Sequence, residues 1–95
     1  NKNQRSILAH KSAILQIATN AVGDIVATAS TFGEVIRLWA TMTGHKLCSF
    51  EKSRSTILTS LTISRTSKFI MACDKVGSIN VYRIPLENIA VDSTV

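Results

Sequence analysis

The chain has 95 residues, of which 45% are apolar and 18% are charged. This composition indicates a folded globular chain of one domain at most, and it excludes a disordered tail. No apolar run approaches the roughly 18 residues that cross a bilayer, and residues 1–5 lack the apolar stretch of a secretory signal. Two cysteines, Cys48 and Cys73, are too few for a disulfide framework. We therefore expect a protein of the reducing cytoplasm.

Basic residues outnumber acidic residues by 11 to 6, which gives a formal net charge of +5. Such a charge favours polyanionic partners, for example phosphate-bearing lipid surfaces or nucleic acid. Six basic residues lie between positions 46 and 75, namely Lys46, Lys52, Arg54, Arg65, Lys68 and Lys75. No block of five like charges occurs, so a solvated surface between strands explains this region equally well.

The first half of the chain predicts four antiparallel strands. Short segments rich in β-branched and aromatic residues are separated by the turn residues Asn20, Gly23, Gly33 and Gly44. The predicted strands are Ile14 to Thr19, Ile25 to Ala29, Val35 to Trp39 and Lys46 to Phe50.

The second half repeats this pattern after the polar stretch 51–56. Its predicted strands are Ile57 to Ile63, Phe69 to Cys73 and Ser78 to Ile84. A shift of 44 residues superposes Gly33 on Gly77, whereas a shift of 43 residues superposes Trp39 on Tyr82. The chain therefore contains one motif twice, and the extra residue of the first copy predicts a β-bulge there.

A repeat of this length, with four short strands and an aromatic residue ending the third, is typical of β-propeller blades. We predict an all-β fold of two four-stranded antiparallel blades. The expected units are an incoming segment or outer strand (1–9), a first blade (10–50), a connecting loop (51–56), a second blade (57–84, extended by an outer strand if one reaches residue 91) and a tail (92–95). Two blades cannot close a ring, because propellers need about four to eight. Further blades or further copies of the chain are expected to complete it.

Several residues match the general pattern of WD-repeat blades. His10 precedes the first strand, Thr28 and Ser30 lie in the second, and Trp39 ends the third. Phe32 stands where such blades carry an Asp in the turn, so the match to the general pattern is partial.

A narrower resemblance rests on longer motifs of the first blade. The matching segments are Ala9-His10-Lys11-Ser12-Ala13-Ile14, Ala27-Thr28-Ala29-Ser30, Gly33 and Ile36-Arg37-Leu38-Trp39. They resemble the fifth blade of the PROPPIN family, seven-bladed propellers that bind phosphoinositides on autophagic and endolysosomal membranes. The resemblance covers residues 9–84 and would make this chain blades five and six. It implies a non-enzymatic scaffold, peripheral on those membranes, which binds PI3P or PI(3,5)P2 and recruits autophagy-type protein partners.

The resemblance also implies which residues contact the lipid headgroup. His10, Thr28, Ser30 and Arg37 match positions around the family's first pocket, and Lys52 or Arg54 would add positive charge. The alternative roles are structural: His10 as a hydrogen-bonding residue at a blade junction, and Arg37 as a side chain stacked across the sheet. Trp39 and Phe50 are expected in the core.

Two departures from the family pattern favour an alternative function. The family carries Phe-Arg-Arg-Gly after the fourth strand, where this chain reads Phe50-Glu51-Lys52-Ser53. The family's second pocket has Ser-Ser-Asp where this chain reads Cys73-Asp74-Lys75. An acid in place of an arginine repels phosphate. The alternative is therefore a WD-repeat protein-interaction scaffold that has lost lipid binding.

Other classes of function have little support in the sequence. His45 and Cys48 form only half of a zinc ligand set, and no Gly-x-Ser-x-Gly motif or histidine with an orienting carboxylate is evident. Aromatic residues make up 5% of the chain, too few for a base-stacking platform. We predict no enzymatic activity, no cofactor, no metal and no nucleic-acid partner.

Overall fold

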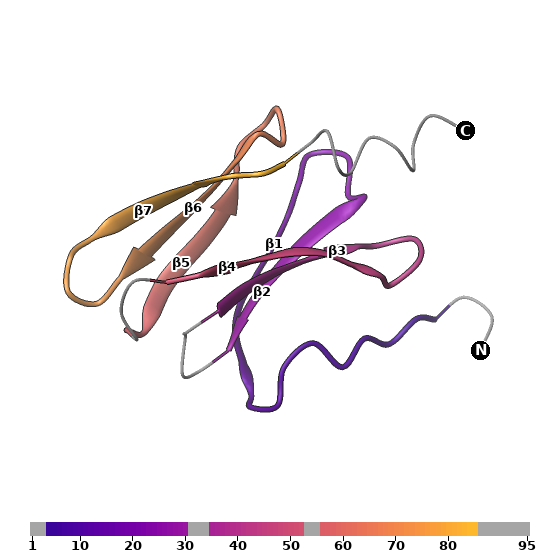
Figure 1. The fold of residues 1–95 in the computed structure, drawn as a ribbon, viewed down its shortest axis with the longest axis horizontal. Coiled ribbons are helices and arrows are strands. Elements are labelled where there is room, and N and C mark those ends of the chain that lie inside the picture. Colours follow the sequence, from indigo (N-terminus) through magenta and orange to yellow (C-terminus); the bar gives the residue numbers. More distant parts are fainter. Residues whose placement is uncertain (1–3, 31–34, 53–55, 86–95) are drawn as a thin grey trace.

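Seven β-strands form the fold in the computed structural model, which describes residues 4–30, 35–52 and 56–85 (Figure 1). The strands are β1 (Ile14–Thr19), β2 (Ile25–Ser30), β3 (Val35–Ala40), β4 (Lys46–Glu51), β5 (Leu58–Ile63), β6 (Phe69–Asp74) and β7 (Ile79–Arg83). Each strand predicted from the sequence is confirmed to within one residue at either end, because β-branched runs and turn residues alternate without conflict.

The strands form two antiparallel sheets that lie beside one another (Figure 1). The first sheet has the order β1-β2-β3-β4, as predicted for the first blade. The second has the order β5-β6-β7. The outer strand that would extend the second blade to residue 91 lies outside the described residues.

The pairing of the strands confirms the internal duplication. In the first sheet Ile14 pairs with Ser30, and the register then shifts before Gln16. In the second sheet the residues 44 positions later behave identically: Leu58 pairs with Asp74, and the register shifts before Ser60. Residues at equivalent positions of the two repeats therefore occupy equivalent places in the two sheets.

The sequence predicts a β-bulge at the extra residue of the first repeat. This prediction is wrong for the β2–β3 ladder, which contains no bulge. The ladder runs without interruption from the pair Ile25–Ala40 to the pair Ala29–Ile36. In the second sheet the corresponding pair is Cys73–Ile79. The extra residue therefore falls in the connection between β2 and β3. A connection can absorb a residue without losing ladder hydrogen bonds, whereas a bulge disrupts the ladder locally.

The hydrophobic core lies between the two sheets. The buried members are Ile25, Ala27, Ala29, Ile36 and Leu38 from the first sheet and Leu58, Leu61, Ile63, Ile70, Ala72 and Ile84 from the second blade. Trp39 is buried, and the partly buried ring of Phe50 lies 5.3 Å from that of Tyr82 between centroids. The predicted burial of Trp39 and Phe50 is thus confirmed, and the two blades are joined by apolar packing.

Asn20 connects the turns of the two sheets at one end of the core. Its side chain is buried, and its Oδ1 accepts a hydrogen bond from the backbone N–H of Ile25 (3.1 Å). Its Nδ2 donates to Asp24 Oδ1 (2.6 Å) and to Ser67 Oγ of the second blade (3.0 Å). A polar residue is accepted here because its amide has partners on both sides.

The outward faces of the two sheets expose apolar side chains. Ile17 on β1 and Phe69, Ile79 and Val81 on the second sheet are all more than two-fifths exposed. In a propeller such faces pack against neighbouring blades. No helix in the described ranges is long and apolar enough to cross a membrane.

Candidate functional site

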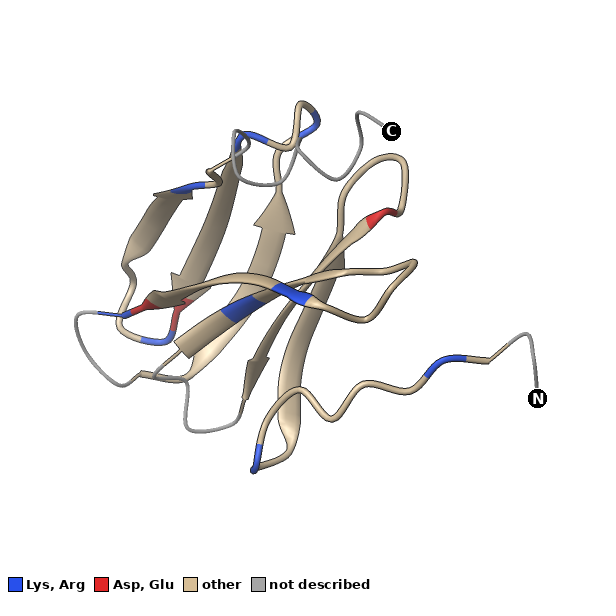
Figure 2. Ribbon diagram, turned by 45° about the vertical axis from the view of Figure 1, so that its right-hand side comes forward, with Lys and Arg blue, Asp and Glu red and all other residues tan. Residues whose placement is uncertain are grey.

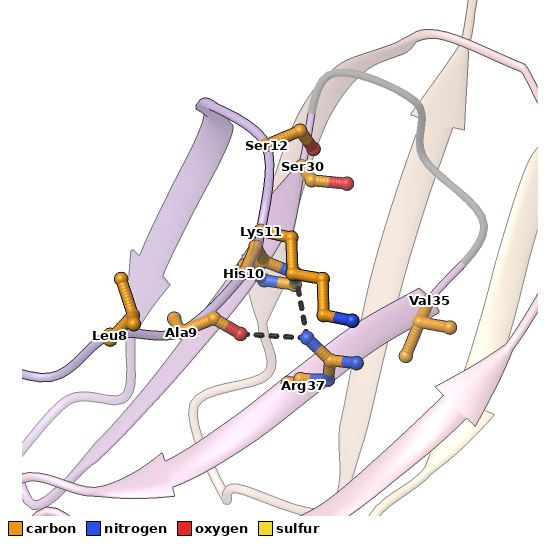
Figure 3. Close-up of a pocket in the computed structure, with 8 residues that line it drawn as sticks. All are labelled: Leu8, Ala9, His10, Lys11, Ser12, Ser30, Val35 and Arg37. Carbon is orange, nitrogen blue, oxygen red and sulfur yellow. Dashed lines mark hydrogen bonds between the residues drawn. The ribbon is translucent and has the colours of Figure 1, made fainter.

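A pocket of about 630 Å³ opens where the segment before β1 passes the facing ends of β2 and β3 (Figure 3). Its lining residues are Leu8, Ala9, His10, Lys11, Ser12, Ser30, Val35 and Arg37. A volume of this size is typical of small-molecule sites. Three of the residues predicted to contact a headgroup, His10, Ser30 and Arg37, therefore share one pocket.

The strand register explains why these side chains meet. Arg37 on β3 pairs with Thr28 on β2, and Ser30 pairs with Ile14 at the start of β1. His10 precedes β1 by four residues, so the chain entering the first strand carries it across the end of the sheet. The site thus depends on three strands and the segment that leads into them.

Arg37 is fixed at the wall of the pocket by two hydrogen bonds. Its Nη1 donates to the carbonyl oxygen of Ala9 (2.7 Å) and to Nδ1 of His10 (3.2 Å), as Figure 3 shows. Both bonds use Nη1. Within the described part of the chain, the guanidinium donors left for a ligand are therefore those on Nη2 and Nε. A planar guanidinium held in this way is suited to bidentate contact with an anion.

His10 and Thr28 connect Arg37 to Trp39 through a chain of hydrogen bonds. Thr28 Oγ1 lies 2.8 Å from His10 Nε2 and accepts a hydrogen bond from Trp39 Nε1 (2.9 Å). A guanidinium can only donate, so Nδ1 of His10 must accept from Arg37. A neutral imidazole then carries its proton on Nε2 and donates it to Thr28. His10, Thr28 and Trp39 are all at most 9% exposed.

The pKa of His10 is lowered from its ordinary value of 6.5, first by burial and then by the positive charge of Arg37. A hydrogen bond to Thr28 acts weakly in the opposite direction. His10 is therefore neutral at pH 7, which agrees with its role as an acceptor for Arg37.

The charge of the pocket suits an anion. Lys11 and Arg37 are positive, Ser12 and Ser30 add hydroxyl groups, and none of the lining residues that the structure describes is acidic. Figure 2 shows that the other basic residues of the described chain lie at separate places along both blades and the segment before β1. Phosphate groups are bound by this combination of guanidinium, ammonium and hydroxyl donors.

The structure separates Lys52 from the other predicted site residues. Its Nζ donates to the carbonyl oxygen of Thr56 (2.6 Å), and it is not among the residues that line the pocket. Burial lowers the pKa of Lys52, and the negative charge of Asp74 opposes that effect. Lys52 therefore interacts with Thr56 and Asp74, next to and within the second blade, and not with the pocket of the first blade. Arg54 lies outside the described residues.

Sequence reasoning missed Lys11 and Ser12 as members of the pocket. Both follow His10 directly in the segment that leads to β1, and both line the pocket. Their position next to His10 could have predicted this. In a strand, neighbouring side chains point to opposite faces, whereas in an irregular segment neighbouring residues can line the same pocket. No group of three or more metal-ligating side chains gathers within the ranges that the structure describes.

The chain is similar to proteins of one family over most of its length. A family model described as PROPPIN matches residues 1–93. Autophagy-related protein 18 of Debaryomyces hansenii is 33% identical over 79 residues, which are 82% of this chain and 14% of that protein. WD repeat domain phosphoinositide-interacting protein 1 of Xenopus laevis is 33% identical over 85 residues, 87% of this chain and 20% of that protein. The chain thus spans no more than a fifth of either relative.

The fold resembles that of a solved structure. Kluyveromyces lactis Hsv2 superposes with a TM-score of 0.80 at 23% sequence identity, over 87% of this chain and 27% of that chain. This likeness supports the assignment of the two sheets to blades of a β-propeller.

Proposed function

Since the chain belongs to the PROPPIN family, we propose that its first blade supplies a phosphate-binding pocket to a propeller that binds phosphoinositides on autophagic or endolysosomal membranes. The proposed ligand is the headgroup of PI3P or PI(3,5)P2, and the proposed role is non-enzymatic recruitment of autophagy partners to that membrane. The curated relatives that this chain matches are named as autophagy-related or phosphoinositide-interacting proteins.

One observation carries the proposal: the guanidinium of Arg37 is held at the wall of the pocket through Nη1, and among the described residues nothing accepts a hydrogen bond from Nη2 or Nε. Ala9 and His10 restrain Nη1, and Lys11 lines the same pocket (Figure 3). A phosphate monoester placed against Arg37 would accept from the guanidinium and from the Lys11 ammonium. A restrained donor loses little freedom on binding, which favours affinity.

The remaining blades enter the proposal as partners of the two described here. The exposed apolar faces at Ile17 and at Phe69, Ile79 and Val81 would be covered by neighbouring blades. We propose that further blades, from the same protein or from other copies of this chain, complete the ring.

Flotation with vesicles that contain or lack PI3P, at physiological salt, tests the proposal. The protein should float with PI3P vesicles, and Arg37→Ala should weaken binding about tenfold or more, since hydrogen bonds to charged groups are worth roughly 1.5–3 kcal/mol. Arg65→Ala is the matched control, because Arg65 is an exposed arginine of the β5–β6 turn and the change in net charge is the same. Two results would reject the proposal: an equal loss of vesicle binding in the Arg37→Ala and Arg65→Ala proteins, or equal flotation with vesicles that contain and vesicles that lack PI3P.

A second candidate is a protein-interaction scaffold that has lost lipid binding. The position of Lys52 favours it, because the ammonium that would replace a family arginine is hydrogen-bonded to Thr56 instead of facing the pocket. A scaffold would hold its protein partner by apolar contact, which salt screens less than it screens attraction to a lipid surface. Partner capture that survives high salt and Arg37→Ala, combined with indifference to PI3P, would favour this function.

A further inference from the structure

Leu8 exposes an apolar side chain at the edge of the first-blade pocket. It is 93% exposed, the largest exposed fraction among the large apolar side chains of the described residues, and it lines the pocket together with Arg37. Figure 3 shows Leu8 and Val35 on opposite sides of Arg37. Single exposed apolar residues are common on protein surfaces, so exposure alone assigns Leu8 no role. Its position beside the phosphate donors is the informative feature.

The segment that carries Leu8 is held on both sides of this residue. On one side, the carbonyl oxygen of the buried Ala9 accepts a hydrogen bond from Arg37 Nη1 (2.7 Å). On the other side, Arg5 Nη1 donates to the carbonyl oxygen of Thr43 (3.2 Å). Leu8 is therefore presented to solvent by a restrained backbone, which loses little freedom when a partner covers the side chain.

A bound lipid would bring a membrane surface to this edge of the pocket. This step rests on the proposed function, in which Arg37 and Lys11 hold a headgroup phosphate. The inositol ring of such a lipid is joined to glycerol and two acyl chains, so a headgroup held in an open pocket leaves the bilayer at the mouth of that pocket. Lys11 is exposed there, and its charge complements anionic lipids. Apolar side chains beside cations enable peripheral proteins to enter the boundary between headgroups and acyl chains.

We infer that Leu8 inserts into the lipid bilayer when the first-blade pocket binds a headgroup, while Lys11 stays at the level of the headgroups. The protein should then bind a phosphoinositide in a membrane more tightly than the same headgroup in solution. Only the membrane offers Leu8 an apolar environment, and removal of its side chain from water is favourable.

Leu8→Gln tests this inference, because glutamine is uncharged and of similar size but polar. The dissociation constant for PI3P vesicles should rise about tenfold, in keeping with the contribution of burying a leucine side chain. The dissociation constant for inositol 1,3-bisphosphate, the soluble headgroup, should not change. The urea midpoint should also stay the same, because Leu8 is 93% exposed in the folded chain.

Val22→Gln is the matched control for the loss of an exposed apolar side chain. Val22 is 79% exposed and lies in the β1–β2 turn, beyond the end of β1 that is away from the pocket. This variant should bind PI3P vesicles as the unchanged protein does. An equal loss of vesicle binding in both variants, or no loss in Leu8→Gln, would overturn the inference.

Tryptophan fluorescence measures the insertion itself. In Leu8→Trp protein bound to PI3P vesicles, brominated acyl chains should quench the new tryptophan, whereas in Val22→Trp protein they should not. Trp39 is buried and contributes the same background to both variants. If a neighbouring blade or another copy of the chain covers Leu8 instead, vesicle-bound Leu8→Trp protein will show no quenching, and the inference is then wrong.

The soluble headgroup separates a failure of this inference from a failure of the proposed function. Unchanged protein that binds neither inositol 1,3-bisphosphate nor PI3P vesicles would reject the proposed function and this inference together. Unchanged protein that binds both, with Leu8→Gln protein indistinguishable from it, would reject the insertion of Leu8 alone.

Discussion

Replacing Thr28 by valine tests the hydrogen-bond network beneath the pocket. Thr28 is 4% exposed, and its Oγ1 has two nitrogen neighbours, Trp39 Nε1 at 2.9 Å and His10 Nε2 at 2.8 Å. Valine keeps the shape and the β-branching of threonine and removes only the oxygen. The substitution therefore leaves two buried N–H donors without an acceptor.

The size of the effect follows from those two donors. An unsatisfied buried polar group costs about 1–3 kcal/mol, so the two donors left by Thr28→Val should lower the free energy of unfolding by roughly 2–6 kcal/mol. His10 cannot relieve the loss by moving its proton to Nδ1, because Arg37 Nη1 donates to that atom at 3.2 Å. Both tautomers of the imidazole thus leave one nitrogen badly matched.

Urea unfolding followed by the fluorescence of Trp39 measures this difference directly. The midpoint should fall while the slope stays constant, since the surface exposed on unfolding is nearly unchanged. Thr28→Ser, which keeps the hydroxyl, should recover most of the loss. Thr62→Val, at an exposed position of β5, is the matched control. A Thr28→Val protein within about 0.5 kcal/mol of that control would refute the reasoning.

Two further predictions concern pH and backbone conformation. The pKa of His10 is lowered in the folded state. Below about pH 6.5, the unfolded chain therefore binds a proton at His10 that the native chain does not bind. The free energy of unfolding should fall as the pH drops through this range. Urea unfolding at pH 7.5 and 5.5 should show this loss and show less of it for His10→Gln; an equal loss in both would contradict the assignment. Gly77 has φ +92° with no atom within 4 Å of an added Cβ, so Gly77→Ala should cost roughly 1–2 kcal/mol through backbone strain alone; an unchanged urea midpoint would contradict that cause.

The strands could be predicted from the sequence because local signals and tertiary packing agree. The runs Ile25–Ser30 and Val35–Ala40 are both strongly β-forming and buried in the core. The position of the extra residue in the first repeat could not be predicted, because sequence comparison alone does not distinguish a bulge from a longer connection. Only the uninterrupted pairing of β2 with β3 decides for the connection.

The candidate site could be predicted in part. Thr28 and Arg37 pair across β2 and β3, so a correct strand register already places them side by side. Lys52 follows the end of β4, where no ladder fixes its direction, and its bond to the Thr56 carbonyl takes it to the second blade. Lys11 was missed for a related reason, since the segment before β1 has no strand periodicity from which to infer which residues face a pocket.

The two blades place side chains of different charge at equivalent positions of the same backbone, Ser30 in the first blade and Asp74 in the second. At position 30 a serine hydroxyl lines the pocket of the first blade, whereas at position 74 an acid places a negative charge that accepts hydrogen bonds from Thr56 and Ser78. The carboxylate of Asp74 also holds the β6–β7 turn through its bonds to Val76 and Ser78. Removing the carboxylate should therefore loosen the β6–β7 turn, because the N–H groups of Val76 and Ser78 would lose their acceptor.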